Sequence, residues 1–180
     1  MFHLIEIDLF FKSKNRYLKE IIKDKKNVKS GIFTQIGHVE AKKKTVVLLA
    51  EDNPVNQQVM IELLHKLNIE CEVARNGEEA VQCFERKNYD LIFMDNEMPI
   101  MNGIDATIKI REIERQREIE REIGENVRPA IQIVGLTGHA STENKSECLE
   151  AGMDFLLFKP LRLRDLRKLL IDLGFLTPSE

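Results

Sequence analysis

The chain has 180 residues, 43% of them apolar and 32% charged, which is enough for one domain with its own core and a short appendage. Residues 1–44 carry eleven Lys/Arg against five Asp/Glu, whereas residues 45–180 carry sixteen against twenty-five. This acidic body argues against a nucleic-acid partner, because neutralising phosphates requires a basic face. No apolar run has the length of a membrane-spanning helix, and the three cysteines include no C-x-x-C pair. We therefore expect no membrane association, and a cytoplasmic or nucleocytoplasmic protein with reduced thiols.

Strand and helix patterns alternate regularly from residue 45 onward. Short apolar runs predict strands, and the first of them, TVVLLA, has the uninterrupted apolar character of a strand buried on both faces. Amphipathic stretches with apolar residues three or four positions apart predict a helix after each strand. In chain order, the predicted elements are a strand at 45–50, a helix at 54–67, a strand at 69–74, a helix at 78–87, a strand at 90–95, a helix from 104, a strand at 130–137, a helix at 141–152, a strand at 153–158 and a helix at 161–174.

Cap and turn residues mark several of these boundaries. Asn53-Pro54 supplies an N-cap and a first turn, Asn76-Gly77 predicts a turn, and Gly152 is expected to close the helix before it. Residues 1–44 precede the alternation, and we expect them to form a basic extension that is partly helical or disordered.

Strand-then-helix units of this length predict an α/β fold, a five-stranded parallel sheet that is doubly wound with helices on both faces. In open sheets of this kind, chemistry gathers outside the carboxyl ends of the strands. The polar residues at those ends are therefore the candidate site. They are Glu51 and Asp52 after the first strand, Asp95 at the end of the third, Thr137 at the end of the fourth and Lys159 after the fifth.

These residue types suit phosphoryl transfer. Carboxylates that meet in one pocket repel one another unless a cation relieves them, and their oxygens suit Mg²⁺. Asp95 could act as a nucleophile, while a cation, the Lys159 ammonium and the Thr137 hydroxyl could stabilise phosphoryl oxygens. Each residue taken singly is more often an ordinary cap, turn or surface residue. Their joint occurrence at successive strand ends favours the functional interpretation.

The chain resembles the receiver domains of response regulators and hybrid histidine kinases in two-component phosphorelays. The motifs that carry the resemblance are LLAEDNPVNQQV (48–59), DLIFMDNEMPIMNG (90–103), VGLTGHA (134–140) and AGMDFLLFKP (151–160). The run EDNPVNQ is similar to receivers attached to hybrid kinases. The resemblance implies a flavodoxin-like (β/α)5 receiver fold over residues 45–175, followed by a tail at 176–180.

The resemblance also implies a role for each candidate residue. Asp95 would be the phosphoacceptor, and Mg²⁺ would be bound by Asp52, helped by Glu51, together with Asp95 and the backbone carbonyl of Glu97. Thr137 would be the switch hydroxyl, Lys159 the phosphate-pairing cation, and the Lys159–Pro160 peptide bond cis. The phosphoryl donor would be a histidine kinase or a histidine phosphotransfer protein. The chain would be a phosphoacceptor with slow self-dephosphorylation, not an enzyme.

The sequence departs from the family pattern at two places. Leu156 occupies the position at which receivers often carry the aromatic residue that couples to the switch threonine. Residues 111–126 are longer than the usual connection, and their Glu–Arg spacing predicts an extended helix with pairs such as Glu114–Arg117. In the family, the positions of Glu97 and His139 tune the lifetime of the acyl phosphate.

Two alternatives stay open at this stage. The first is a phosphorylation-independent adaptor with the receiver fold, which Leu156 would suit. The second is a hydrolase that forms an aspartyl phosphate, although such enzymes usually carry Asp-x-Asp, where this chain has Asp95-Asn96-Glu97.

Overall fold

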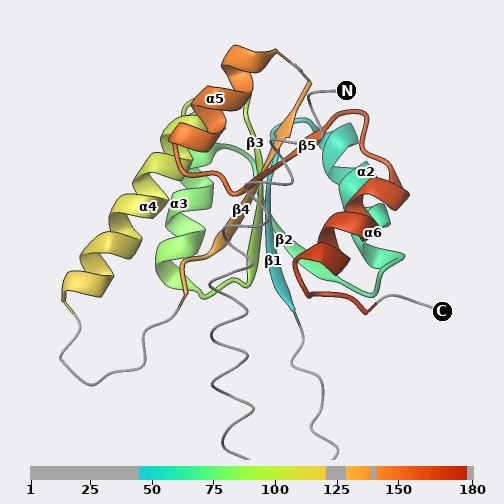
Figure 1. Cartoon of the computed structure of the whole chain (residues 1–180), viewed down its shortest axis with the longest axis horizontal. Coiled ribbons are helices and arrows are strands. Elements are labelled where there is room, and N and C mark those ends of the chain that lie inside the picture. The colour runs from blue at the N-terminus through green and yellow to red at the C-terminus, as the bar shows by residue number, and fades with distance from the viewer. Residues whose placement is uncertain (1–44, 121–128, 139–140, 178–180) are drawn as a thin grey trace, which may run out of the picture. The chain divides into compact units, whose positions relative to one another are not determined.

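The computed structural model describes residues 45–120, 129–138 and 141–177. Its parallel strands form one sheet in the order β2-β1-β3-β4-β5, and strands and helices alternate along the chain (Figure 1). The predicted doubly wound α/β fold is confirmed. The bounds are β1 Val46–Ala50, α2 Pro54–His65, β2 Glu70–Ala74, α3 Gly77–Arg86, β3 Leu91–Asp95, α4 Gly103–Ile119, β4 Gln132–Thr137, α5 Thr142–Glu150, β5 Phe155–Phe158 and α6 Leu163–Asp172.

The central strands are apolar throughout because both of their faces are covered. Helices α3, α4 and α5 lie on one side of the sheet, and α2 and α6 lie on the other (Figure 1). Successive residues of a strand point to opposite faces, so Leu48 and Ile92 join the core under α3 and α4, while Leu49 and Phe93 join the core under α2 and α6. All four side chains are fully buried. The two cores hold the strand ends in register at one edge of the sheet.

Caps at the helix ends follow the sequence at two of the three predicted places. The Asn53 side chain accepts hydrogen bonds from the N–H groups of the first turn of α2, as predicted. Gly152, at φ +103°, ends α5 with hydrogen bonds from its own N–H to Leu149 and from the Met153 N–H to the Cys148 carbonyl. The predicted turn at Asn76-Gly77 is wrong, because Asn76 is the N-cap of α3 and Gly77 is its first residue.

Helix α4 has 17 residues and continues to Ile119, so the extended helix predicted at 111–126 is confirmed as far as residue 119. Residues 121–128 lie outside the described residues. The predicted Glu114–Arg117 pair is replaced by other contacts, because Glu114 accepts hydrogen bonds from Arg111 and from the Ile131 N–H, each at 2.6 Å. Helix α4 is therefore tied to the start of β4 as well as packed on it.

Arg111 is the centre of this connection. Its guanidinium donates to the Gly152 carbonyl at 2.8 and 3.0 Å, to the Ile131 carbonyl at 2.8 Å and to the Asp154 carboxylate at 2.8 Å. Asp154 also accepts a hydrogen bond from the Ile133 N–H. A planar fork with this many donors can join a helix, a strand and a loop at once, which a lysine cannot do.

Two strand boundaries differ from the prediction. Strand β4 begins at Gln132 and β5 at Phe155, each two residues later than the apolar runs suggested. Met153 is 3% exposed and so is a core residue before β5, which explains its apolar character. Among the described residues, none of the helices combines the length with the apolar composition that a membrane span requires. The basic extension predicted at 1–44 lies outside the described residues.

Candidate active site at the carboxyl edge of the sheet

The acidic residues predicted at different strand ends lie together at one edge of the sheet. Strands β1 and β3 are adjacent and parallel, and the pairing of Ala50 with Met94 places the residues that follow them side by side. Oxygen atoms of Glu51, Asp52 and Asp95 all lie within 4.8 Å of one another. Glu51 and Asp95 are buried, whereas Asp52 is exposed. The sheet topology therefore brings together carboxylates that are 43 residues apart in the sequence.

Lys159 reaches this cluster from the end of β5. Its ammonium lies 2.8 Å from Glu51 Oε2 and 2.8 Å from Asp95 Oδ2. The Lys159 N–H donates to the Thr137 carbonyl at 2.8 Å, which connects the loop after β5 to the end of β4. The Lys159–Pro160 peptide bond is cis, as predicted. One ammonium thus partly neutralises two carboxylates that would otherwise repel each other.

Residues of α2 hold Glu51 in place. Glu51 Oε1 accepts from the Asn56 side-chain amide at 3.0 Å and from the Asn53 N–H at 3.2 Å. The Gln57 amide donates to the Glu51 backbone carbonyl at 2.7 Å. With Lys159 on Oε2, both carboxylate oxygens of Glu51 already have donors. Asp52 is consequently better placed than Glu51 to offer an oxygen to an incoming cation.

The start of α4 packs closely against the backbone of Asp95. The Cβ atom of any other residue at Gly103 would overlap the Asp95 carbonyl group, so glycine alone allows α4 to start this close to β3. The loop between them turns through Ile100, which is 78% exposed with φ +69°, and the Met101 N–H donates to the Pro99 carbonyl across it at 2.7 Å. A β-branched residue with positive φ is strained, so this loop holds a backbone conformation that its sequence does not prefer.

The acidic surroundings change the ionisation of Asp95. Burial raises the pKa of its carboxyl to about 6, the hydrogen bond from Lys159 opposes this rise, and the nearby Glu51 charge adds to it. Burial alone would lower the pKa of Lys159, but its hydrogen bonds to Asp95 and Glu51 outweigh burial and raise that pKa. At neutral pH, above this pKa, the Asp95 carboxyl is therefore mostly ionised beside the Lys159 ammonium, and a divalent metal would relieve its negative charge.

The residues present fit a hard divalent cation. The donors are carboxylate oxygens only, which suits Mg²⁺ better than a soft metal. Asp52 is exposed, so a bound ion could keep several waters, as Mg²⁺ prefers. Glu97 is also exposed, and its backbone N–H donates to Asp95 Oδ1 at 3.4 Å.

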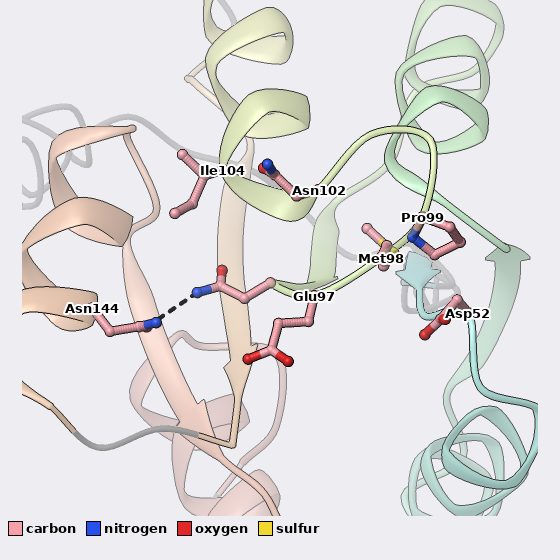
Figure 2. Close-up of a pocket in the computed structure, with 8 residues that line it drawn as sticks. Asp52, Glu97, Met98, Pro99, Asn102, Ile104 and Asn144 are labelled. Carbon is pink, nitrogen blue, oxygen red and sulfur yellow. Dashed lines mark hydrogen bonds between the residues drawn. The ribbon is translucent and has the colours of Figure 1, made fainter.

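A pocket of about 420 Å³ opens beside the carboxylates, between the loop after β3 and the start of α5. Figure 2 shows Asp52 and Asn144 at opposite ends of it, with Glu97 between them and Ile104 above Glu97 in the first turn of α4. Asn96 also lines the pocket, and its side-chain amide donates to Asn144 Oδ1 at 3.2 Å. The pocket therefore reaches the acidic cluster at Asp52.

Thr137 faces a polar group of α5. Its hydroxyl donates to Asn144 Oδ1 at 3.5 Å, and the side chain is 1% exposed. Leu156, at the position where the resemblance anticipated an aromatic ring, is a partly buried member of the core under α3 and α4. Phe155 joins the opposite core, and Phe158 is 40% exposed with the Lys145 ammonium over its ring. The described side-chain contact of Thr137 is thus with the Asn144 amide of α5.

Comparison with known proteins identifies this arrangement. The response regulator receiver domain family matches residues 47–171. The chain belongs to this family. As a receiver domain of the phosphorelay type, it is similar to two-component response regulator 24 of Arabidopsis thaliana, with 39% identity over 75% of this chain and 88% of that protein.

Receivers of hybrid kinases are also similar to it. Hybrid signal transduction histidine kinase K of Dictyostelium discoideum is 42% identical over 67% of this chain, and the chain spans only 10% of that kinase. Among solved structures, the Saccharomyces cerevisiae Ssk1 receiver domain, crystallised with the phosphotransfer protein Ypd1, is 35% identical with a TM-score of 0.63, covering 69% of this chain and 85% of that one. A Pseudomonas aeruginosa sensor kinase receiver with magnesium in its active site cleft is 36% identical with a TM-score of 0.57, covering 70% and 93%.

Sequence reasoning identified the charged residues of this site but missed the amides around them. Asn56 and Gln57 belong to the motif EDNPVNQQV, so their place in the first turns of α2 was a signal that they contact Glu51. Asn96 follows Asp95 directly, yet nothing in the spacing indicates that it contacts Asn144, which is 48 residues away. This contact depends on how α5 packs against the end of β3.

Proposed function

We propose that this receiver domain accepts a phosphoryl group on Asp95 and thereby changes its affinity for a partner protein. The observation that carries the proposal is the placement of Asp95 among Glu51, Asp52 and Lys159, with Lys159 Nζ 2.8 Å from Asp95 Oδ2. Membership of the receiver family supports it, because receiver domains are phosphoacceptors. Residues 45–175 would form the domain, in keeping with the match over 47–171.

The step that we propose is a transfer from a phosphohistidine. An Asp95 carboxylate oxygen attacks phosphorus, a P–O bond forms, the P–N bond to the donor imidazole breaks, and the imidazole nitrogen keeps the bonding electrons. Lys159 lies where its ammonium can pair with a phosphoryl oxygen, and the Thr137 hydroxyl can donate to another. Mg²⁺, held by Asp52 and Asp95 with the Glu97 backbone carbonyl, would supply the remaining positive charge. Glu51 would act mainly by orienting Lys159.

The donor that we propose is a histidine kinase or a histidine phosphotransfer protein. The similar Ssk1 receiver was crystallised with such a phosphotransfer protein. We propose no multiple turnover on external substrates, so that loss of the phosphoryl group is limited to slow hydrolysis of the acyl phosphate. No comparison favours a phosphorylation-independent adaptor, and the acidic cluster that an adaptor would not need is intact.

The direct test uses intact-mass spectrometry of the full chain after incubation with Mg²⁺ and acetyl phosphate. We expect one added phosphoryl group per chain, none with EDTA and none in Asp95→Asn. Asp172→Asn is the matched control, because Asp172 is exposed at the end of α6, and it should be phosphorylated like the parent.

Phosphotransfer profiling against purified phosphohistidine proteins would then identify the donor. Transfer to the parent but not to Asp95→Asn supports the proposal. A parent chain that takes up no phosphoryl group from any donor, although Mg²⁺ binds, would rule out the phosphoacceptor function. An affinity for the partner that is the same with and without phosphorylation would leave only the adaptor.

A further inference from the structure

A cluster of buried polar contacts lies beside Thr137. Asn144 Oδ1 is an acceptor shared by the Asn96 amide at 3.2 Å, the Thr137 hydroxyl at 3.5 Å and the Cys148 thiol at 3.6 Å. The Asn96 amide also donates to Cys148 Sγ at 2.9 Å. Asn96, Thr137 and Cys148 are all buried, so water competes little with these contacts.

The three donors come from different parts of the fold. Asn96 follows the phosphoacceptor residue, Thr137 ends β4, and Cys148 lies on α5 itself. Asn144 is in the first turn of α5, where its own N–H donates to the Ser141 hydroxyl at 3.2 Å. A change in the donors that bond to Asn144 Oδ1 is therefore transmitted directly to the first turn of α5.

The Thr137 hydroxyl carries one hydrogen, so it can donate to Asn144 or to a phosphoryl oxygen on Asp95, but not to both. The present bond of 3.5 Å is long and therefore weak, so breaking this bond to Asn144 costs little. Once the hydroxyl is withdrawn, Asn144 keeps its bond from Asn96, whose backbone is continuous with Asp95. Leu156 is an aliphatic residue of the core, so it has no polar group that could bond to the Thr137 hydroxyl.

We propose that Asn144 is a positioning residue that holds the Thr137 hydroxyl before phosphorylation and transmits its withdrawal to α5. This inference rests on the proposed phosphoacceptor function. It assigns to an amide of α5, supported by Asn96, the coupling that an aromatic side chain at position 156 cannot provide in this chain. The inference predicts that Asn144 competes with the phosphoryl group for one hydrogen bond.

A double-mutant cycle tests this competition. The full chain with Mg²⁺ is titrated with beryllium fluoride, a phosphoryl mimic, and binding is followed by fluorine NMR in the parent, in Asn144→Ala, in Thr137→Val and in the double variant. We expect Asn144→Ala to bind the mimic about two- to threefold more tightly, as expected for the loss of one weak competing hydrogen bond. In the Thr137→Val background the same change should have no effect. The near-isosteric Asn144→Leu provides a second variant in case the alanine variant is poorly folded.

Hydrogen exchange over residues 142–150 gives an independent readout. Beryllium fluoride should change the protection of α5 in the parent, and this change should be lost in Asn144→Ala although the mimic still binds. Ser146→Ala is the control on the same helix, because Ser146 is exposed and its hydroxyl contacts only Glu150 among the described residues. It should behave as the parent.

The outcomes separate the two proposals. A parent that does not bind the mimic overturns the phosphoacceptor function and this inference with it. A parent that binds, with an Asn144 effect of equal size in both Thr137 backgrounds or with a change in α5 protection that persists in Asn144→Ala, overturns the positioning role alone.

Discussion

Replacing Asp95 with asparagine should stabilise the metal-free protein at neutral pH. The folded state raises the pKa of this carboxyl from 3.8 to about 6, first through burial and also through the Glu51 charge, against the hydrogen bond from Lys159. A raised carboxyl pKa means that the folded state holds a proton which the unfolded state releases. Stability from this group is therefore complete below the ordinary pKa and is lost as pH rises through about 4 to about 6.

The size of the effect follows from the same values. Ionising a carboxyl whose pKa is raised by about two costs the folded state roughly 3 kcal/mol at pH 7 at most. Asparagine removes this cost but also removes the charge that pairs with Lys159, which keeps Glu51 as a partner. We expect a net gain of about 1–2 kcal/mol in the free energy of unfolding at pH 7, and almost no difference at about pH 4.

The measurement is urea unfolding of the full chain in EDTA, followed by far-UV circular dichroism because the chain contains no tryptophan. Parent and Asp95→Asn are compared at several pH values between about 4 and about 7, with the exposed Asp172→Asn as control. With Mg²⁺ the order should reverse, since binding of the metal stabilises the parent. An Asp95→Asn variant that is less stable than the parent at pH 7 without metal, or a difference that does not grow with pH, would refute the reasoning.

Three further predictions concern residues around the site. Arg111→Lys should lower the free energy of unfolding by about 2–4 kcal/mol, because a lysine cannot replace the forked hydrogen bonds and leaves Asp154 poorly paired. Urea unfolding measures this loss, and a loss below about 0.5 kcal/mol would contradict the role of the guanidinium. Ile100→Gly should raise the free energy of unfolding by about 1 kcal/mol, because the exposed side chain is lost at little cost and glycine tolerates the positive φ. A decrease in the free energy of unfolding in the same assay would show that no strain is stored at residue 100. Lys159→Ala should raise the pKa of Asp95 above about 6, because the ammonium favours the ionised carboxylate. Carbon NMR of the labelled carboxyl measures this pKa, and a lower pKa in the variant would contradict our account of the site.

The fold and the charged part of the site could be predicted from the sequence. Apolar runs of strand length that alternate with amphipathic helices admit few topologies, and parallel strands with helical connections must end at a common edge. The residues at the carboxyl ends of β1, β3, β4 and β5 could therefore be placed near one another without coordinates. The Asn53 cap and the Gly152 helix end were likewise readable, because each depends on residues close to it in sequence.

Only the tertiary structure revealed which side chains satisfy one another. Both oxygens of Glu51 are engaged, by α2 residues and by Lys159, and this depends on how α2 is rotated against the sheet. Asn96 and Asn144 meet across 48 residues, and Arg111 reaches Asp154 across 43, through helices that pack from different directions. Strand order and residue periodicity are encoded locally and repeatedly along the chain, whereas each of these contacts depends on one helix orientation, which packing of the whole core decides.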